Sequence, residues 1–149
     1  MKIAIGADHG GFRLKGVLVE FLKRRGYEVK DFGTFSEESC DYPIIGYEVA
    51  KAVSTRKFSR GILICKTGIG MCIVANKVRG IRAALCDRVD IAISSRQHND
   101  ANILVLAANI VSDDMAKKIV KAWLATSSLG GRHRRRVMQI NQIERKLFG

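Results

Sequence analysis

Residues 61–70 read GILICKTGIG, a continuous apolar run that passes directly into a glycine-rich turn. The run Gly61–Cys65 shows no alternation of polar and apolar residues, so it predicts a strand buried on both faces, as in a parallel sheet. The turn leads into a predicted helix over about 70–78. This strand–turn–helix unit favours an α/β fold with helices covering the sheet.

The same alternation of strands and helices continues on both sides of this unit. Gly26 is placed to end a first amphipathic helix, and Pro43 suits the first turn of a second. The predicted strands are 2–7, 27–32, 61–65, 81–85 and 103–107, and the other predicted helices centre on 14–22, 45–53, 88–96, 116–124 and 137–147. We therefore expect a doubly wound three-layer sandwich with a five-stranded parallel sheet in the order 2-1-3-4-5, plus a C-terminal helical arm.

Length and charge limit the function classes. With 149 residues the chain is expected to form one domain, 1–149, of which about 130–149 is a basic arm. The formal charge is +12. Three explanations are open: a nucleic-acid-binding surface, a solvated surface or a site for small anions. No apolar run approaches the roughly 18–20 residues of a membrane span, and the N-terminus does not look like a signal peptide. We expect a cytoplasmic protein without a membrane partner.

Two loops should face each other at the carboxyl ends of adjacent strands, where doubly wound sheets bind ligands. One loop begins with Asp8-His9-Gly10-Gly11, and the other is 65–70. Gly68 and Gly70 allow backbone N–H groups to point at an anion beside a helix start. Cys65 at a strand end is more often a small core residue, but this setting should favour its thiolate. Thr67 either donates to a ligand or caps the following helix.

A second polar cluster, 94–102, lies before the fifth strand and therefore at the opposite end of the sheet from Cys65. If His98 acts on the same ligand as Cys65, the simplest arrangement is a two-fold dimer with shared sites. Arg132 and Arg136, four residues apart on one helical face, would reach a neighbour's site in the same way and suit a phosphate.

The sequence contains no strong motif for binding a cofactor or a metal ion. The dinucleotide-binding glycine spacing is missing after the first strand, so NAD binding is not expected. The cysteines and histidines are scattered without zinc-ligand spacing, so neither metal nor disulfide is expected.

Several motifs together resemble type B ribose-5-phosphate isomerase, a family that includes allose- and galactose-6-phosphate isomerases. The resemblance runs in order from Lys2 to about Glu144. Its motifs are Asp8-His9-Gly10-Gly11, Asp41-Tyr42-Pro43, 61–70, Ala75-Asn76-Lys77, 80–84, 96–102 and Gly130-Gly131-Arg132-His133.

This resemblance implies an aldose–ketose isomerase that interconverts ribose 5-phosphate and ribulose 5-phosphate through a cis-enediolate, without metal or other cofactor. It implies that Cys65 is the base and that His98 opens the sugar ring. It also implies a homodimer or tetramer with shared active sites and a phosphorylated sugar, not nucleic acid, as the ligand. The implied catalytic residues are Cys65, His98, Thr67 and Asp8, and the implied substrate-binding residues are Asp8, His9, Tyr42, Lys66, Thr67, Gly68, Ile69, Gly70, Asn99, Asn109, Arg132 and Arg136.

The chain departs from the family pattern at three positions. Lys66 replaces the glycine usual after the catalytic cysteine. Asn109 replaces a phosphate-binding arginine, which would either weaken the phosphate clamp or shift it to Arg134 or Arg135. Met71 stands where a variant branch carries a glutamate base, so Cys65 is the only candidate base. The alternatives are an isomerase of another phosphosugar (a hexose 6-phosphate or tetrose phosphate), a catalytically inactive isomerase-like subunit, and a basic nucleic-acid-binding module using 132–146.

Overall fold

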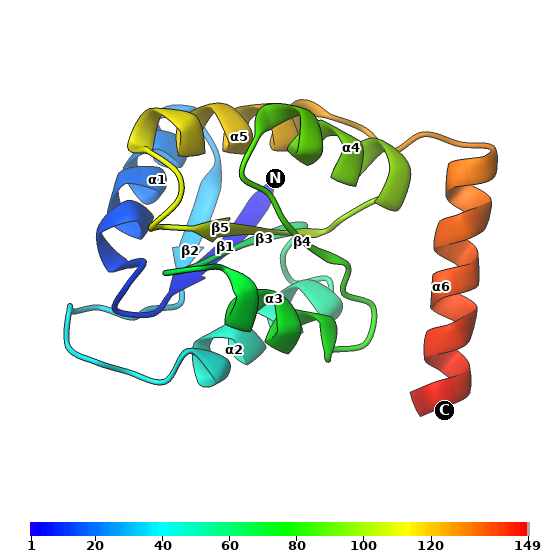
Figure 1. Ribbon diagram of the computed structural model, residues 1–149, viewed down its shortest axis with the longest axis horizontal. Helices are drawn as coiled ribbons and strands as arrows, with labels where there is room; N and C mark the ends of the chain where they lie inside the picture. Colours follow the sequence, from blue (N-terminus) through cyan, green and yellow to red (C-terminus); the bar gives the residue numbers. More distant parts are fainter. Residues whose placement is uncertain (149) are drawn as a thin grey trace.

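The computed structural model describes residues 1–148. Five parallel strands form one sheet with helices on both faces, and a sixth helix stands at one edge (Figure 1). The strands are β1 (Lys2–Ala7), β2 (Glu28–Asp31), β3 (Arg60–Cys65), β4 (Ala83–Leu85) and β5 (Ile103–Ala107). The helices are α1 (Phe12–Arg24), α2 (Tyr42–Ser54), α3 (Ile69–Asn76), α4 (Val89–Asn99), α5 (Asp113–Ala125) and α6 (Arg132–Phe148). The expected α/β class and every expected strand and helix are confirmed.

The strand order is β2-β1-β3-β5-β4, so the prediction that the fourth strand lies between the third and the fifth is wrong. The two strands differ in burial: β5 is buried along its whole length, whereas β4 has two half-buried residues and one exposed residue, Leu85. A short, partly exposed strand fits a sheet edge, and a continuous apolar strand fits the interior.

This order also decides which face each helix covers. Because the chain turns back from β4 to β5, a right-handed crossover places α4 on the face opposite α3. Figure 1 shows α1, α4 and α5 on one face of the sheet and α2 and α3 on the other. Alternate strand residues separate accordingly: Ile62 and Ile64 pack with α1 and α5, whereas Leu63 and Cys65 pack with α2 and α3.

Two predicted boundaries move for local reasons. The strand expected from Ile81 starts at Ala83, because the Ile81 N–H donates to the Val78 carbonyl and the Arg82 N–H to Oδ1 of Asn102. The helix expected to end near 96 continues to Asn99 as α4. His98 and Asn99 therefore lie in the last turn of a helix and not in a loop.

Candidate active site

A pocket of about 420 Å³ opens at the carboxyl ends of β1 and β3. These strands are neighbours and pair Ala7 with Ile64, so Asp8 and Cys65 leave the sheet side by side. The pocket confirms the expected meeting of the two loops. Its lining residues are Asp8, His9, Tyr42, Cys65, Lys66, Thr67, Ile69, Gly70 and Ile73.

The first loop is held by its own carboxylate. Oδ1 of the buried Asp8 accepts hydrogen bonds from the N–H groups of Gly10 and Gly11, at 2.9 and 3.2 Å. A side chain at Gly11 would lie 2.8 Å from the carbonyl oxygen of Ile64, so glycine is needed for the two loops to approach. Because both bonds use Oδ1, the second oxygen of Asp8 remains as an acceptor for a hydroxyl group.

His9 is oriented by a residue distant in sequence. The N–H of Cys40 donates to Nδ1 of His9 at 3.2 Å, which places the ring hydrogen of neutral His9 on Nε2. The imidazole can thus donate from Nε2 to an anion. We did not anticipate this contribution of Cys40, because no spacing rule links positions 9 and 40.

The second loop is shaped to expose backbone donors. Gly68, at φ +75°, precedes α3 in the left-handed region, which suits glycine. Oγ1 of Thr67 accepts from the Ile69 N–H at 3.3 Å, so the hydroxyl supports the helix start while its own hydrogen remains available. The first N–H groups of a helix lack intrahelical acceptors, and the helix dipole is positive there. The loop can therefore stabilise negative charge on oxygen.

The floor and wall of the pocket are packed closely. Cys65 is a free thiol that is 5% exposed, on the α2–α3 side of the sheet. A side chain at Gly70 would lie 2.5 Å from Cζ of Tyr42, so the tyrosine ring rests directly on the glycine. Ile69 and Ile73 add an exposed apolar rim. Ile73 was missed by sequence reasoning, although its spacing of four from Ile69 places it on the same helical face.

Lys66 lies at the pocket mouth with its stem across the first loop. A side chain at Gly10 would overlap Cγ of Lys66 and lie 3.2 Å from its Cε. Asn109 does not line the pocket, but its N–H donates to the Lys66 carbonyl at 3.0 Å. The adjacent Ala108 N–H donates to the Cys65 carbonyl at 2.9 Å, so the segment after β5 supports the Cys65 loop through its backbone.

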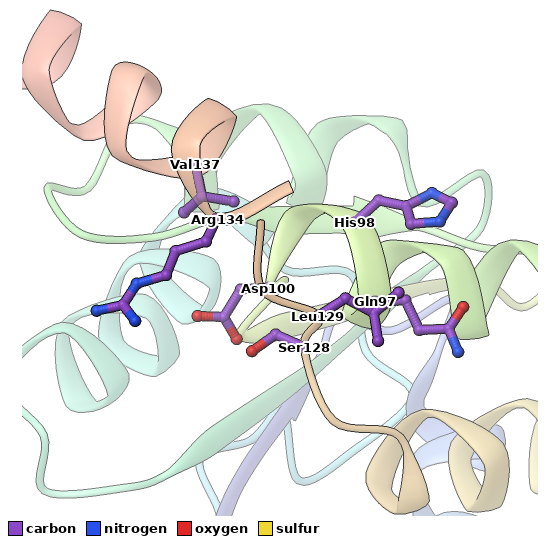
Figure 2. A pocket seen from close by; sticks show the side chains of 8 residues that line it. Gln97, His98, Asp100, Ser128, Leu129, Arg134 and Val137 are labelled. Atoms are coloured by element: carbon purple, nitrogen blue, oxygen red, sulfur yellow. The ribbon is translucent and has the colours of Figure 1, made fainter. Parts of the chain in front are cut away.

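His98, Asn99, Arg132 and Arg136 are not part of this pocket. His98 lines a separate cavity of about 340 Å³ that also includes Leu129 and Arg134. In Figure 2 the His98 and Arg134 side chains point in opposite directions. Within one subunit the expected site residues therefore form two groups, because α4 ends near the amino end of β5.

His133 joins the second group. Its ring stacks on that of His98, with centroids 4.2 Å apart and planes at 10°. Desolvation, followed by the charges of His98, Arg132 and Arg136, lowers the pKa of His133. Arg132 and Arg136 are exposed, so this basic group is accessible to a ligand or to a second molecule.

Within residues 1–148, each helix is too short or too polar to span a bilayer. The same part of the chain brings no three His, Cys, Asp or Glu side chains into a group that could hold a metal ion.

Comparison with known proteins identifies relatives across the whole chain. A family model described as Ribose/Galactose Isomerase matches residues 3–140. Ribose-5-phosphate isomerase B of Escherichia coli (strain K12) is 49% identical over 145 residues, which cover 97% of each chain.

Two solved structures have the same fold. Ribose-5-phosphate isomerase B of Clostridium thermocellum is 54% identical, with a TM-score of 0.97 over 99% of each chain. The enzyme of the same name from Mycoplasma genitalium, solved with bound ribulose-5-phosphate, is 39% identical, with a TM-score of 0.94 over 97% of each chain.

Proposed function

The chain belongs to the Ribose/Galactose Isomerase family, and on that basis we propose that it interconverts D-ribose 5-phosphate and D-ribulose 5-phosphate. One observation carries the proposal: the Cys65 thiol lines a pocket together with Lys66, Thr67, Ile69 and Gly70, where α3 begins. This arrangement supports Cys65 as the base, beside backbone N–H groups at a helix start that would stabilise an oxyanion.

In the proposed reaction, the Cys65 thiolate removes the proton from C2 of the open-chain aldose and returns it to C1. Between these two transfers negative charge lies on the enediolate oxygens, beside the backbone of residues 66–70 and the Thr67 hydroxyl, and the proton of the C2 hydroxyl moves to O1. One such donor contributes about 3–4 kcal/mol to barrier lowering. A positioned acid–base group adds roughly 10²–10⁴-fold to the rate.

Ring opening requires a general acid. We assign it to His98 of a second copy, with Asp8 across the ring and Asn99 beside the acid. His98 is exposed, and it lies outside the Cys65 pocket of its own subunit. A homodimer or tetramer with shared sites brings the two groups together. In this assembly 1–149 acts as one domain, and the arm at about 130–149 reaches the neighbour.

The phosphate group is assigned to Nε2 of His9 together with Arg132 and Arg136 from the neighbour. Forked guanidinium donors bind phosphate in pairs of hydrogen bonds. Arg134 lines the His98 cavity, which supports it as the replacement for the arginine missing at Asn109. Tyr42 lines the sugar pocket.

A second candidate substrate is another phosphosugar, such as allose 6-phosphate, galactose 6-phosphate or a tetrose phosphate. The family description includes galactose, and the lysine stem across the pocket mouth supports a change in substrate length. In both cases the reaction type is the same.

A substrate panel tests the proposal. Isomerisation of ribose 5-phosphate, allose 6-phosphate and a tetrose phosphate is measured for the wild type and for Cys65→Ala. We expect ribose 5-phosphate to give the highest kcat/KM and Cys65→Ala to lose at least about a hundredfold. Cys40→Ala is the matched control, because its backbone N–H still reaches His9. Undiminished turnover in Cys65→Ala would exclude this mechanism.

A further inference from the structure

A larger polar cavity lies at the opposite end of the sheet from Cys65. It has a volume of about 800 Å³ and is bounded by the end of α2, the start of β3, the loop between α3 and β4, and the last turns of α6. Arg60 begins β3 and Cys65 ends it. With a rise of about 3.3 Å per residue, the two residues are about 16 Å apart along the strand. This cavity is therefore separate from the proposed active site.

The cavity lining is strongly basic. It contains five arginines and two carboxylates, a net charge of +3. The carboxylates are Asp100 and Glu144, and the arginines are Arg56, Arg60, Arg79, Arg82 and Arg145. The arginines come from three segments that are far apart in the sequence, 56–60, 79–82 and 145, so no single charge run in the chain indicates this cluster.

Both carboxylates are already engaged by the protein. Asp100 accepts from Arg82 at 3.2 Å and from the buried Arg96 at 2.8 Å. Both oxygens of Glu144 accept from the Gly80 N–H, at 2.9 and 3.0 Å, which fastens α6 to the α3–β4 loop. Asp100 is thus paired with Arg82, one of the five lining arginines, and Glu144 with a backbone N–H, and the formal charge of the lining remains +3.

The pKa of the Arg60 guanidinium is lowered by its surroundings in this cavity. It is partly buried, and its Nη1 donates to the carbonyl of Ser59 at 2.9 Å. Burial and the nearby charges of Arg96 and Arg82 lower the pKa of Arg60, against an opposing contribution from Asp100. A bound anion would relieve this unfavourable environment.

We propose that this cavity binds a small molecule carrying a diphosphate group, at a second anion site that the isomerase reaction does not use. Guanidinium groups suit phosphate oxygens because their planar donors form paired hydrogen bonds. A phosphate ester carries about −1.5 to −2 at neutral pH, so two linked phosphates carry about −3 and match the lining. Inorganic pyrophosphate and nucleoside or sugar diphosphates share this chemistry.

Isothermal titration of the full-length protein with inorganic pyrophosphate tests the site, with ADP as a second ligand. We expect one pyrophosphate per subunit at this cavity, apart from any bound at the proposed substrate phosphate site, and about tenfold weaker binding at the cavity in Arg60→Gln. The double variant Arg56→Gly/Arg145→Gln should weaken binding at least as much. This double variant should fold like the wild type, because Arg56 has φ 61°, where glycine is favoured, and Arg145 is exposed. Tighter binding of ADP would support a nucleotide ligand, and equal binding would support recognition of the diphosphate alone.

Two controls separate this site from other basic surfaces. Arg24→Gln removes an exposed arginine that pairs with Glu20 on α1, and it should leave binding unchanged. Arg132→Gln/Arg136→Gln alters the proposed substrate phosphate site and should also retain binding. Loss in that double variant with retention in Arg60→Gln would overturn the proposal, as would no heat at millimolar pyrophosphate. Tighter binding of a single-stranded oligonucleotide than of pyrophosphate would also overturn it, in favour of a nucleic-acid surface.

Discussion

His98 and His133 stack with ring centroids 4.2 Å apart, which joins the end of α4 to the first turn of α6. Desolvation, followed by the charges of His98, Arg132 and Arg136, lowers the pKa of His133 from its ordinary value of 6.5. The folded protein therefore binds fewer protons here than the unfolded chain as pH falls through about 6.5. The contribution to stability is present above this pH and is lost below it.

His133→Gln should therefore flatten the acid side of the stability profile. Between about pH 7.5 and 5.5, the wild type should lose more free energy of unfolding than the variant, as measured by urea denaturation at fixed protein concentration. Parallel pH profiles for the two proteins would contradict this assignment.

Gly70→Ala should reduce activity by pushing Tyr42 out of place. The added methyl group would meet Cζ of Tyr42 at 2.5 Å and its hydroxyl oxygen at 2.8 Å. Overpacking of this kind costs about 1–3 kcal/mol, and we expect kcat/KM to fall about tenfold or more. Gly16→Ala is the matched control, since that helical glycine has nothing within 4 Å of the added carbon. The control should keep full activity and gain about 0.5–1 kcal/mol in stability. Equal behaviour of the two variants would refute the close packing.

Lys15→Met should destabilise the fold without touching the site. The ammonium is 2% exposed and donates to both oxygens of Asp31 and to the Thr34 carbonyl, each at 2.7 Å. Removing one partner of a buried pair costs about 3–5 kcal/mol. Lys2→Met breaks the exposed pair with Glu28 at 3.7 Å and should cost less than about 1 kcal/mol. Urea midpoints compare the two, and similar losses would be inconsistent with this difference.

Mixing two inactive variants should restore activity if sites are shared. In a mixture of Cys65→Ala and His98→Ala subunits, half of the dimers are hybrids, and each has one complete site. Recovered activity should reach about a quarter of that of the wild type. Subunit exchange is verified by a mass tag on one variant. No recovery after verified exchange would mean that Cys65 and His98 do not meet across an interface.

Lys66→Met should lower kcat/KM by about fivefold at low salt, because it removes a positive charge at the pocket mouth while keeping a similar stem over Gly10. The difference from the wild type should shrink as ionic strength rises. The same loss at every salt concentration would indicate a packing effect and not a charge effect.

Local sequence patterns determined most of the elements and the two loops that line the candidate site. The β5 boundaries 103–107 follow from an apolar run between polar residues, and Pro43 marks the first turn of α2. The meeting of Asp8 with Cys65 followed from a general rule, because carboxyl ends of adjacent parallel strands share one edge.

Tertiary structure alone decided the strand order, and with it the face that α4 covers. It also decided the orientation of His9 by Cys40 and the gathering of arginines around the second cavity. The physical reason is the same in each case. Hydrophobic periodicity indicates which residues of one helix or strand are buried. The strand order, the His9 orientation and the arginine cluster depend instead on which segments, distant in sequence, pack against each other. β5 displaced β4 from the sheet interior because it buries more apolar surface, and that comparison exists only once both strands have packed.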